Sequence, residues 1–283
     1  MTESIPTSGI TEIADLARAG VEPRALKLGQ FHVVQGGAGE VVQLDLTGDR
    51  YRNNPGRLAA AVALTHTDSL LAYWDKHHDE ESECYADRDK RTITAVLDAH
   101  QGADQPTDQR ARWQTHRATM TLTYSEALTA WLSHNGKLMG QVEFAEFCED
   151  WMSVIVEPDA ADLVEMAQQF QATTKASFKS GYKLSNGQRV LEYTETIDAS
   201  VKGDSIAVPT GIVLSMPIWR GANAREDMTA RIRFRVNHGG PGQLGIGYKL
   251  DAPTEVVDTA FEAEVDRVEQ HIGRPVLRGT PAG

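Results

Sequence analysis

Apolar residues recur along the chain with two different periods, and the helical spacing of the middle third changes to alternation near Gly181. Apolar positions three or four residues apart are typical of helices with one buried face. The helices that this spacing predicts cover residues 11–19, 57–78, 125–134, 142–156 and 159–178, and a last one covers residues 253–272. Gly273 and Pro275 follow the last of these segments and are typical of a helix end.

Segments in which polar and apolar residues alternate predict strands, because successive side chains of a strand point to opposite faces. The predicted strands cover residues 31–34, 41–46, 83–86, 92–99, 117–123, 182–185, 189–197, 206–219, 230–236 and 244–250. The Gly-rich residues 36–39 predict a turn that joins the first two strands into a hairpin. Asn186 and Gly187 predict a second hairpin, because they supply the positive φ angles of a type I′ turn.

Strands neighbour strands in this order, and helices neighbour helices. Such grouping favours an α+β fold with antiparallel pairing over a doubly wound parallel sheet. We therefore expect antiparallel β-sheets packed with a central group of helices and a C-terminal helix. Residues 1–56 are expected to form an N-terminal arm with its hairpin, and residues 57–283 the main α+β domain; the alternative is one continuous domain.

The predicted helix over residues 142–156 has an apolar face and an acidic face. Its apolar positions are Phe144, Phe147, Cys148, Trp151 and Ile155, and its acidic positions are Glu143, Glu146, Glu149 and Asp150. Because the two sets fall on opposite sides of a helix, we expect one face to be buried and the other to meet solvent or a partner.

A basic stripe is expected on the predicted strand over residues 230–236. Arg231, Arg233 and Arg235 alternate there with apolar residues, so a strand places the three guanidinium groups on one face. Three interpretations stay open. The arginines could pair with the acidic helix face, within one chain or between copies; they could meet solvent alone; or they could bind phosphate or nucleic acid.

The composition limits the class of protein. The 283 residues are 41% hydrophobic and 24% charged, which is ordinary for a globular protein with a sizeable core. Forty acidic residues against 28 Lys and Arg give a formal net charge of −12, which makes nucleic acid an unfavourable partner. The first residues do not resemble a secretion signal, and the longest apolar run, residues 59–64, is too short to cross a membrane. We therefore expect a soluble cytosolic protein.

No motif in the sequence identifies a reaction centre. Cys84 and Cys148 form no C-x-x-C pattern, and we expect both to be buried thiols. Residues 240–245 have the spacing G-x-G-x-x-G, but alternating residues follow them, whereas a dinucleotide site requires a helix there. Nucleophile and phosphate-loop motifs are absent from the sequence, so no cofactor is expected.

Asp98, His100 and His116 are the strongest candidates for a site. Asp98 and His100 end a predicted strand on the same face, and His116 follows across a loop. These groups could ligate a divalent metal or act as an acid and base, and the alternative is a structural pairing that holds the loop. Residues 77–81 also contain metal-ligating side chains, but their place at a predicted helix end is typical of a solvated surface.

Five segments together resemble a known family. They are V-L-D-A-H at residues 96–100, W-Q-T-H-R-A at 113–118, G-K-L-M-G-Q-V-E-F-A-E-F-C-E-D at 136–150, N-G-Q-R-V-L-E-Y at 186–193, and the predicted strand over 209–217. This order resembles the YfdQ-like family of phage and prophage proteins of unknown function, over residues 57–279. The resemblance implies a phage or prophage origin and a location in the host cytoplasm, and it carries no activity, cofactor or site residue.

The leading hypothesis is a non-enzymatic phage protein that assembles into a homo-oligomer or a shell-like particle through its sheet edges and charged faces. One alternative is a metal-dependent or nucleotide-directed enzyme centred on Asp98, His100 and His116. Another is an acidic modulator that binds a host protein through the acidic face of the helix over residues 142–156.

Overall fold

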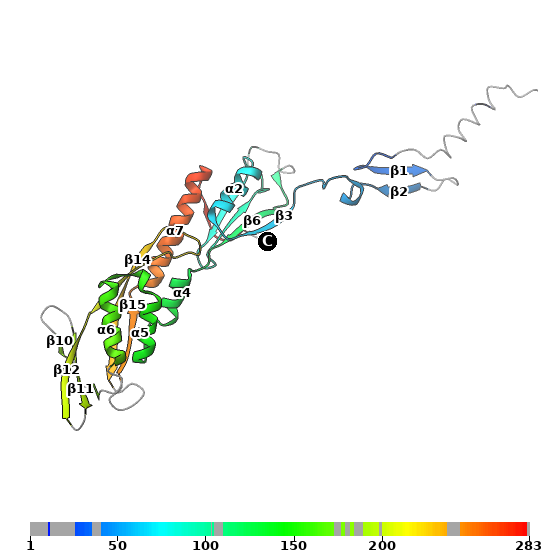
Figure 1. Cartoon of the computed structure of the whole chain (residues 1–283). Coiled ribbons are helices and arrows are strands. Elements are labelled where there is room, and N and C mark those ends of the chain that lie inside the picture. Colours follow the sequence, from blue (N-terminus) through cyan, green and yellow to red (C-terminus); the bar gives the residue numbers. More distant parts are fainter. Residues whose placement is uncertain are drawn as a thin grey trace, which may run out of the picture. The chain divides into compact units, whose positions relative to one another are not determined.

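The computed structural model describes residue 11 and residues 26–35, 41–102, 104, 110–172, 177–178, 182–183, 189–197, 200–236 and 244–281. The chain forms two compact units, Met1–Ala59 and Ala60–Gly283 (Figure 1). Four predicted features lie wholly or mostly outside the described residues: the helix over residues 11–19, the turns at residues 36–39 and 186–187, and the glycine segment at residues 240–243.

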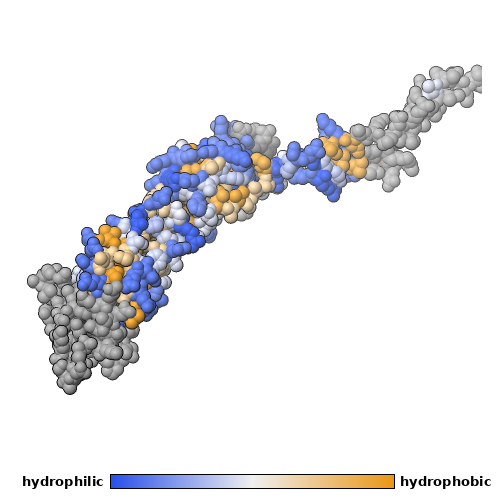
Figure 2. Space-filling model, viewed as in Figure 1, coloured by the Kyte–Doolittle hydropathy of each residue, from blue (hydrophilic) through white to orange (hydrophobic). Residues whose placement is uncertain are grey.

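The first unit contains the predicted N-terminal hairpin. Strand β1 (Phe31–Gln35) pairs antiparallel with β2 (Val41–Asp45), and a short 3-10 helix, η1 (Asp49–Tyr51), follows. Phe31, Val33 and Val41 are each more than half exposed, and they contribute to the hydrophobic patch over the hairpin in Figure 2.

The second unit begins with a five-stranded mixed sheet in the order β16-β4-β5-β6-β3. Its strands are β3 (Ala60–Leu64), β4 (Glu83–Asp87), β5 (Thr92–Val96), β6 (His116–Thr121) and β16 (Leu277–Arg278). The β4–β5 and β5–β6 pairs are antiparallel, whereas β3 runs parallel to β6 and β16 runs parallel to β4. We expected antiparallel pairing from the sequence, and this sheet differs because two of its four strand pairs are parallel.

The predicted helix over residues 57–78 is wrong in its first half. Residues Ala60–Leu64 form strand β3, and helix α2 (Thr67–His77) begins only after them. A short apolar run fits a strand as well as a helix, and here pairing with β6 decides the backbone conformation. The reason is tertiary: the five backbone positions of β3 lie beside a strand that is more than fifty residues later in the sequence.

Helices α2 and α7 (Pro253–Ile272) lie side by side along the first sheet (Figure 1). One face of the sheet is buried and carries the side chains of Cys84, Ala86, Ile93, Ala95, Ala118 and Met120. The helices contribute Leu70, Trp74, Phe261 and Val265 to the same apolar core. The predicted C-terminal helix is thus confirmed, and Val257, Ala260, Phe261, Val265 and Val268 form its buried face.

The second sheet of this unit is antiparallel throughout, in the order β7-β15-β14-β13-β8. Its strands are β7 (Leu138–Met139), β8 (Ile155–Glu157), β13 (Gly211–Met216), β14 (Glu226–Val236) and β15 (Leu244–Leu250). The break between β13 and the strand before it falls at Pro209 and Thr210, within a segment that the alternation predicts as one strand.

Helices α4 (Glu126–Ser133) and α5 (Gln141–Asp150) cover the apolar face of the second sheet. The ring of Tyr248 on β15 lies 4.6 Å from that of Trp131 on α4 and 5.8 Å from that of Phe147 on α5. The Tyr248 hydroxyl donates a hydrogen bond of 2.7 Å to the Trp131 carbonyl, so this buried polar group is satisfied.

Helix α5 is shorter than the predicted helix over residues 142–156. It ends at Asp150, a 3-10 turn η2 (Met152–Val154) follows, and Ile155 begins strand β8. A residue that precedes proline is restricted to extended conformations, and Glu157 precedes Pro158. Pairing of β8 with β13 then stabilises the extended backbone.

A further sheet contains the long antiparallel pair β11 (Arg189–Ile197) and β12 (Ser200–Val208). Two short strands, β9 (Ser177–Phe178) and β10 (Tyr182–Lys183), each pair antiparallel with β11. Helix α6 (Ala160–Ala172) precedes it and packs against α5. The predicted helix over residues 159–178 therefore ends earlier than expected. The fold as a whole is α+β, as the grouping of segments predicts.

The buried side chains of the second unit form one continuous core that includes both five-stranded sheets. Helix α7 contacts α2 beside the first sheet and β14 in the second. Trp219, which follows β13, donates from Nε1 to the Ala260 carbonyl on α7 at 3.3 Å. Among the described residues, no helix has the length and apolar character that a membrane crossing requires.

The expectation that both cysteines are buried is confirmed. Burial raises the pKa of the Cys84 thiol and of the Cys148 thiol to about 12. Both side chains are therefore protonated at neutral pH and pack as small apolar groups.

We expect Gly247→Ala to destabilise the second sheet. A Cβ atom at Gly247 on β15 would lie 2.1 Å from the Lys137 carbonyl oxygen beside β7, so the two backbones would have to separate. The loss in the free energy of unfolding should be about 3 kcal/mol, the upper end for an overpacked site. Urea unfolding followed by circular dichroism measures it, with Gly102→Ala as the matched control, because its nearest neighbour is a side-chain atom at 3.8 Å. Equal midpoints for the two variants would contradict the close approach.

Candidate functional site

Asp98 and His116 are brought together by hydrogen bonds between the Asp98 carboxylate and the backbone around the start of β6. Asp98 follows β5, and its carboxylate accepts the backbone N–H groups of Thr115 and His116, each at 2.9 Å. These two bonds attach the end of β5 to the start of β6. The carboxylate therefore acts as the acceptor for a loop closure, which is the structural role that the sequence leaves open beside the metal role.

The imidazole of His116 is buried and lies in a cluster of rings with Tyr73 and His77, which are partly buried. Only 4% of the residue is exposed, and Nε2 forms a hydrogen bond of 2.9 Å with the Tyr73 hydroxyl on α2. The His77 ring lies 5.2 Å from the His116 ring. Burial lowers the pKa of His116, the charge of His77 lowers it further, and Asp98 opposes both effects. The neutral imidazole is thus the form that the folded chain favours.

His100 has a separate environment. It is exposed, and its Nδ1 accepts the backbone N–H of Arg112 at 2.9 Å. The Arg112 guanidinium in turn donates to Asp79 at 2.7 Å. Across the described ranges of the chain, no three His, Cys, Asp or Glu side chains gather closely enough to hold a metal ion. Asp98, His100 and His116 therefore share a loop without converging on one point.

The arginines of β14 form an exposed row, which we call the basic stripe (Arg231, Arg233 and Arg235). All three side chains are exposed, while Ile232 between them is buried. Their neighbours on β15 are Lys249, Gly247 and Gly245, in that order. The glycines have no side chains, so no β15 side chain covers the second and third arginines.

The members of the basic stripe differ in their partners. Arg231 pairs with Asp251, with an Nη2–Oδ1 distance of 2.5 Å. Arg233 and Arg235 form no ion pair with any carboxylate that the structure describes. Two guanidinium groups of one strand therefore present their charge outward.

The acidic residues of α5 also face outward, and we call them the acidic face (Glu143, Glu146, Glu149 and Asp150). All four are exposed, while Phe144, Phe147 and Cys148 are buried against the core. Glu143 also accepts the Gly140 N–H at 3.4 Å, which helps to cap the helix. The amphipathic pattern that the sequence predicts for this segment is present over its helical part.

The basic stripe and the acidic face lie on opposite sides of the second sheet. Helix α5 packs on the side of Tyr248, and the cross-strand partner of Tyr248 is the buried Ile232 of β14. The arginines alternate with Ile232 and so point to the other side. The sheet itself separates the two charged sets within one copy of the chain.

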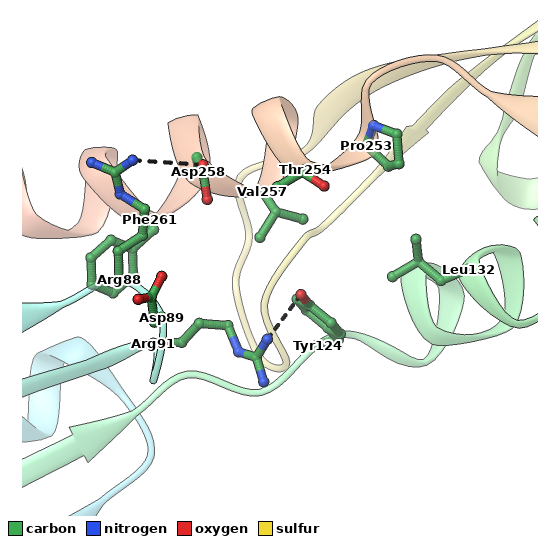
Figure 3. Close-up of a pocket in the computed structure, with 10 residues that line it drawn as sticks. All are labelled: Arg88, Asp89, Arg91, Tyr124, Leu132, Pro253, Thr254, Val257, Asp258 and Phe261. Carbon is green, nitrogen blue, oxygen red and sulfur yellow. Dashed lines mark hydrogen bonds and ion pairs between the residues drawn. The ribbon is translucent and has the colours of Figure 1, made fainter.

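A cavity of about 310 Å³ lies at the start of α7 (Figure 3). The turn between β4 and β5, Tyr124 ahead of α4, and Leu132 on α4 complete its walls. Its lining residues are Arg88, Asp89, Arg91, Tyr124, Leu132, Pro253, Thr254, Val257, Asp258 and Phe261. The sequence signal for it is weak, because the charge run at residues 87–91 reads as an ordinary solvated turn.

A family model described as an uncharacterized conserved protein (DUF2303) matches residues 44–281. No curated protein and no solved structure matches the chain. The matched residues include both five-stranded sheets, the loop held by Asp98, the basic stripe and the acidic face.

Stability should fall as the pH is lowered, and His116 should account for part of this. Because its pKa is lower in the folded chain than the value of about 6.5 for a free imidazole, the unfolded chain takes up a proton first. As the pH is lowered from about 6.5, the free energy of unfolding should therefore decrease, by at most about 1.4 kcal/mol per pH unit. Urea unfolding between about pH 7.5 and 5.5 measures the slope. In His116→Gln, which keeps a hydrogen-bonding partner for Tyr73, the slope should be smaller, and an unchanged slope would contradict the assignment.

Proposed function

We propose that this chain, which belongs to the family of uncharacterized conserved proteins (DUF2303), is a non-enzymatic phage or prophage protein that assembles with copies of itself in the host cytoplasm. The observation that carries the assembly is the exposure of the basic stripe and the acidic face on opposite sides of one sheet. The phage or prophage origin and the host cytoplasm rest on the resemblance of five sequence segments to the YfdQ-like family.

The two charged sets have similar lengths. Residues two apart on a strand are about 6.7 Å apart, so the three arginines span about 13 Å. Glu143 and Asp150 are seven residues apart on a helix, which corresponds to about 10 Å. A helix from one copy laid along β14 of another can therefore bring several opposite charges together at once.

Several pairs are needed for this contact to be stable. A single exposed ion pair contributes little, between 0 and about 1 kcal/mol, because solvent and salt screen it. The net charge of −12 also makes whole copies repel one another at long range. Assembly therefore depends on local complementarity that exceeds the overall repulsion, which makes it sensitive to the sign of a few residues.

The geometry also limits the form of the assembly. The basic stripe and the acidic face are different surfaces, so a contact between them is heterologous and not self-complementary. Heterologous contacts produce closed rings when the rotation between copies closes, and open filaments when it does not. A shell-like particle would additionally require contacts at the sheet edges.

Charge reversal on either surface should abolish assembly, and mixing the two variants should restore it. One variant is Arg233→Glu/Arg235→Glu, which avoids the Arg231–Asp251 pair. The other is Glu146→Lys/Glu149→Lys/Asp150→Lys, which makes this face net positive and leaves the helix cap formed by Glu143 in place. Each variant alone carries two surfaces of like sign, so its copies repel. In a 1:1 mixture, every contact between unlike copies again joins opposite charges.

Size-exclusion chromatography with light scattering measures the mass of each sample at micromolar concentration. The wild-type chain and the mixture should form oligomers, and each variant alone should be a monomer. Asp266→Lys is the matched control, because Asp266 is exposed on α7 outside both surfaces. A monomeric wild-type chain, or variants that assemble as the wild type does, would refute the proposal.

A further inference from the structure

The cavity at the start of α7 has a floor of apolar side chains and a rim of charged ones. Leu132, Val257 and Phe261 form the apolar part, together with the ring of Tyr124 (Figure 3). Its volume of about 310 Å³ is at the lower end of the range for sites that take small molecules. The charged residues at its rim decide which kind of molecule fits.

Arg91 is held in an unusual backbone conformation at this rim. Its φ angle is +53°, in the left-handed region that glycine adopts most easily. The backbone is fixed there by two hydrogen bonds, from the Arg91 N–H to the Arg88 carbonyl at 3.0 Å and from the Leu122 N–H to the Arg91 carbonyl at 2.9 Å. A long cationic side chain thus occupies a position where glycine would be the less strained choice.

The guanidinium of Arg91 is held in place by a stack of rings. It lies 4.5 Å from the centre of the Tyr124 ring, and Nη1 donates to the Tyr124 hydroxyl at 3.0 Å. The Tyr124 ring stacks at 5.8 Å on Trp219, which is itself hydrogen-bonded to α7. The cation is therefore positioned before any ligand arrives, which reduces the entropy cost of binding.

This guanidinium keeps unused donors. Its Nε is buried and has no acceptor among the described residues, and no described carboxylate pairs with the group. Arg88 differs, because its guanidinium forms ion pairs with two carboxylates. Its Nη1 lies 3.7 Å from Oδ2 of Asp258, and its Nη2 lies 3.4 Å from Oε1 of Glu262. Of the two arginines that line this cavity, Arg91 is thus the one without an ion pair among the described residues.

The remaining charges at the rim have opposite effects on an anion. The first turn of α7, at Pro253 and Thr254, presents the positive end of a 20-residue helix to the same cavity. Asp89 is exposed at the rim and opposes an anion there. An oxyanion beside Arg91 would gain charge-assisted hydrogen bonds from a planar, forked donor.

We propose that this cavity binds a small molecule that carries a carboxylate or phosphate group on a flat apolar body. The oxyanion accepts hydrogen bonds from the Arg91 guanidinium, and the apolar body packs on Leu132, Val257 and Phe261. This site goes beyond self-assembly and does not depend on it, because none of its residues belongs to the basic stripe or the acidic face.

Isothermal titration calorimetry of the full chain with three probes tests the site. The probes are phenyl phosphate, benzoate and neutral benzyl alcohol, which share a ring and differ in the head group. At least one oxyanion probe should bind at millimolar concentration or below, and more tightly than benzyl alcohol. Comparison of the two oxyanions identifies phosphate or carboxylate as the preferred group. Binding of neither, or equal binding of the neutral probe, would refute the proposal.

Two variants test the assigned residues. Arg91→Gly removes the guanidinium and also relieves the left-handed backbone, so the chain should fold at least as well while the affinity falls by roughly 10- to 100-fold. Asp89→Asn removes the opposing charge and should strengthen binding of the same probe. Thermal unfolding of both variants confirms that they are folded. Wild-type affinity in Arg91→Gly would overturn the role of Arg91 and with it the site.

Discussion

The apolar face of α7 is the constraint on which the second unit depends. Val257, Phe261 and Val265 are buried along one side of this helix, and the core that contains them continues through both five-stranded sheets. The helix begins immediately after β15, contacts β14 and α2, and leads to β16 at the edge of the first sheet. Burial of each such side chain stabilises the fold by roughly 1.5–3 kcal/mol, so the two sheets are held in one body by apolar packing.

Once both sheets are held by a common core, the direction of every exposed face follows from the pleat. Ile232 and Tyr248 must point toward α4 and α5, because their burial stabilises the sheet. The arginines of β14 must then point to the other side, and α5 must turn its carboxylates to solvent. The charged surfaces are thus a consequence of where the apolar residues pack. Their exposure within one copy is the observation that supports the proposed contact between copies.

The same packing explains how Asp98 joins the end of β5 to the start of β6, where His116 lies. Adjacent strands β5 and β6 bring the two residues together, but the carboxylate is occupied by two backbone N–H groups. The Nε2 of the His116 imidazole is hydrogen-bonded to the Tyr73 hydroxyl on α2. The Asp98 carboxylate and the Nε2 of His116 are thus each hydrogen-bonded, which is the ordinary requirement for a group removed from water. The cavity beside α7 differs, because the Nε of Arg91 is buried without an acceptor among the described residues.

The sequence by itself determined the α+β class, the N-terminal hairpin, α7, the buried cysteines and the alternation of arginines with apolar residues on β14. These features depend on local periodicity, which is set by the geometry of a helix or strand before any long-range contact forms. Only the tertiary structure decided that Ala60–Leu64 is a strand, because β6 lies far away in the sequence. It also decided which side of the sheet α5 covers and that Arg91, Tyr124 and the start of α7 enclose one cavity, since contacts between distant segments leave no period in the sequence.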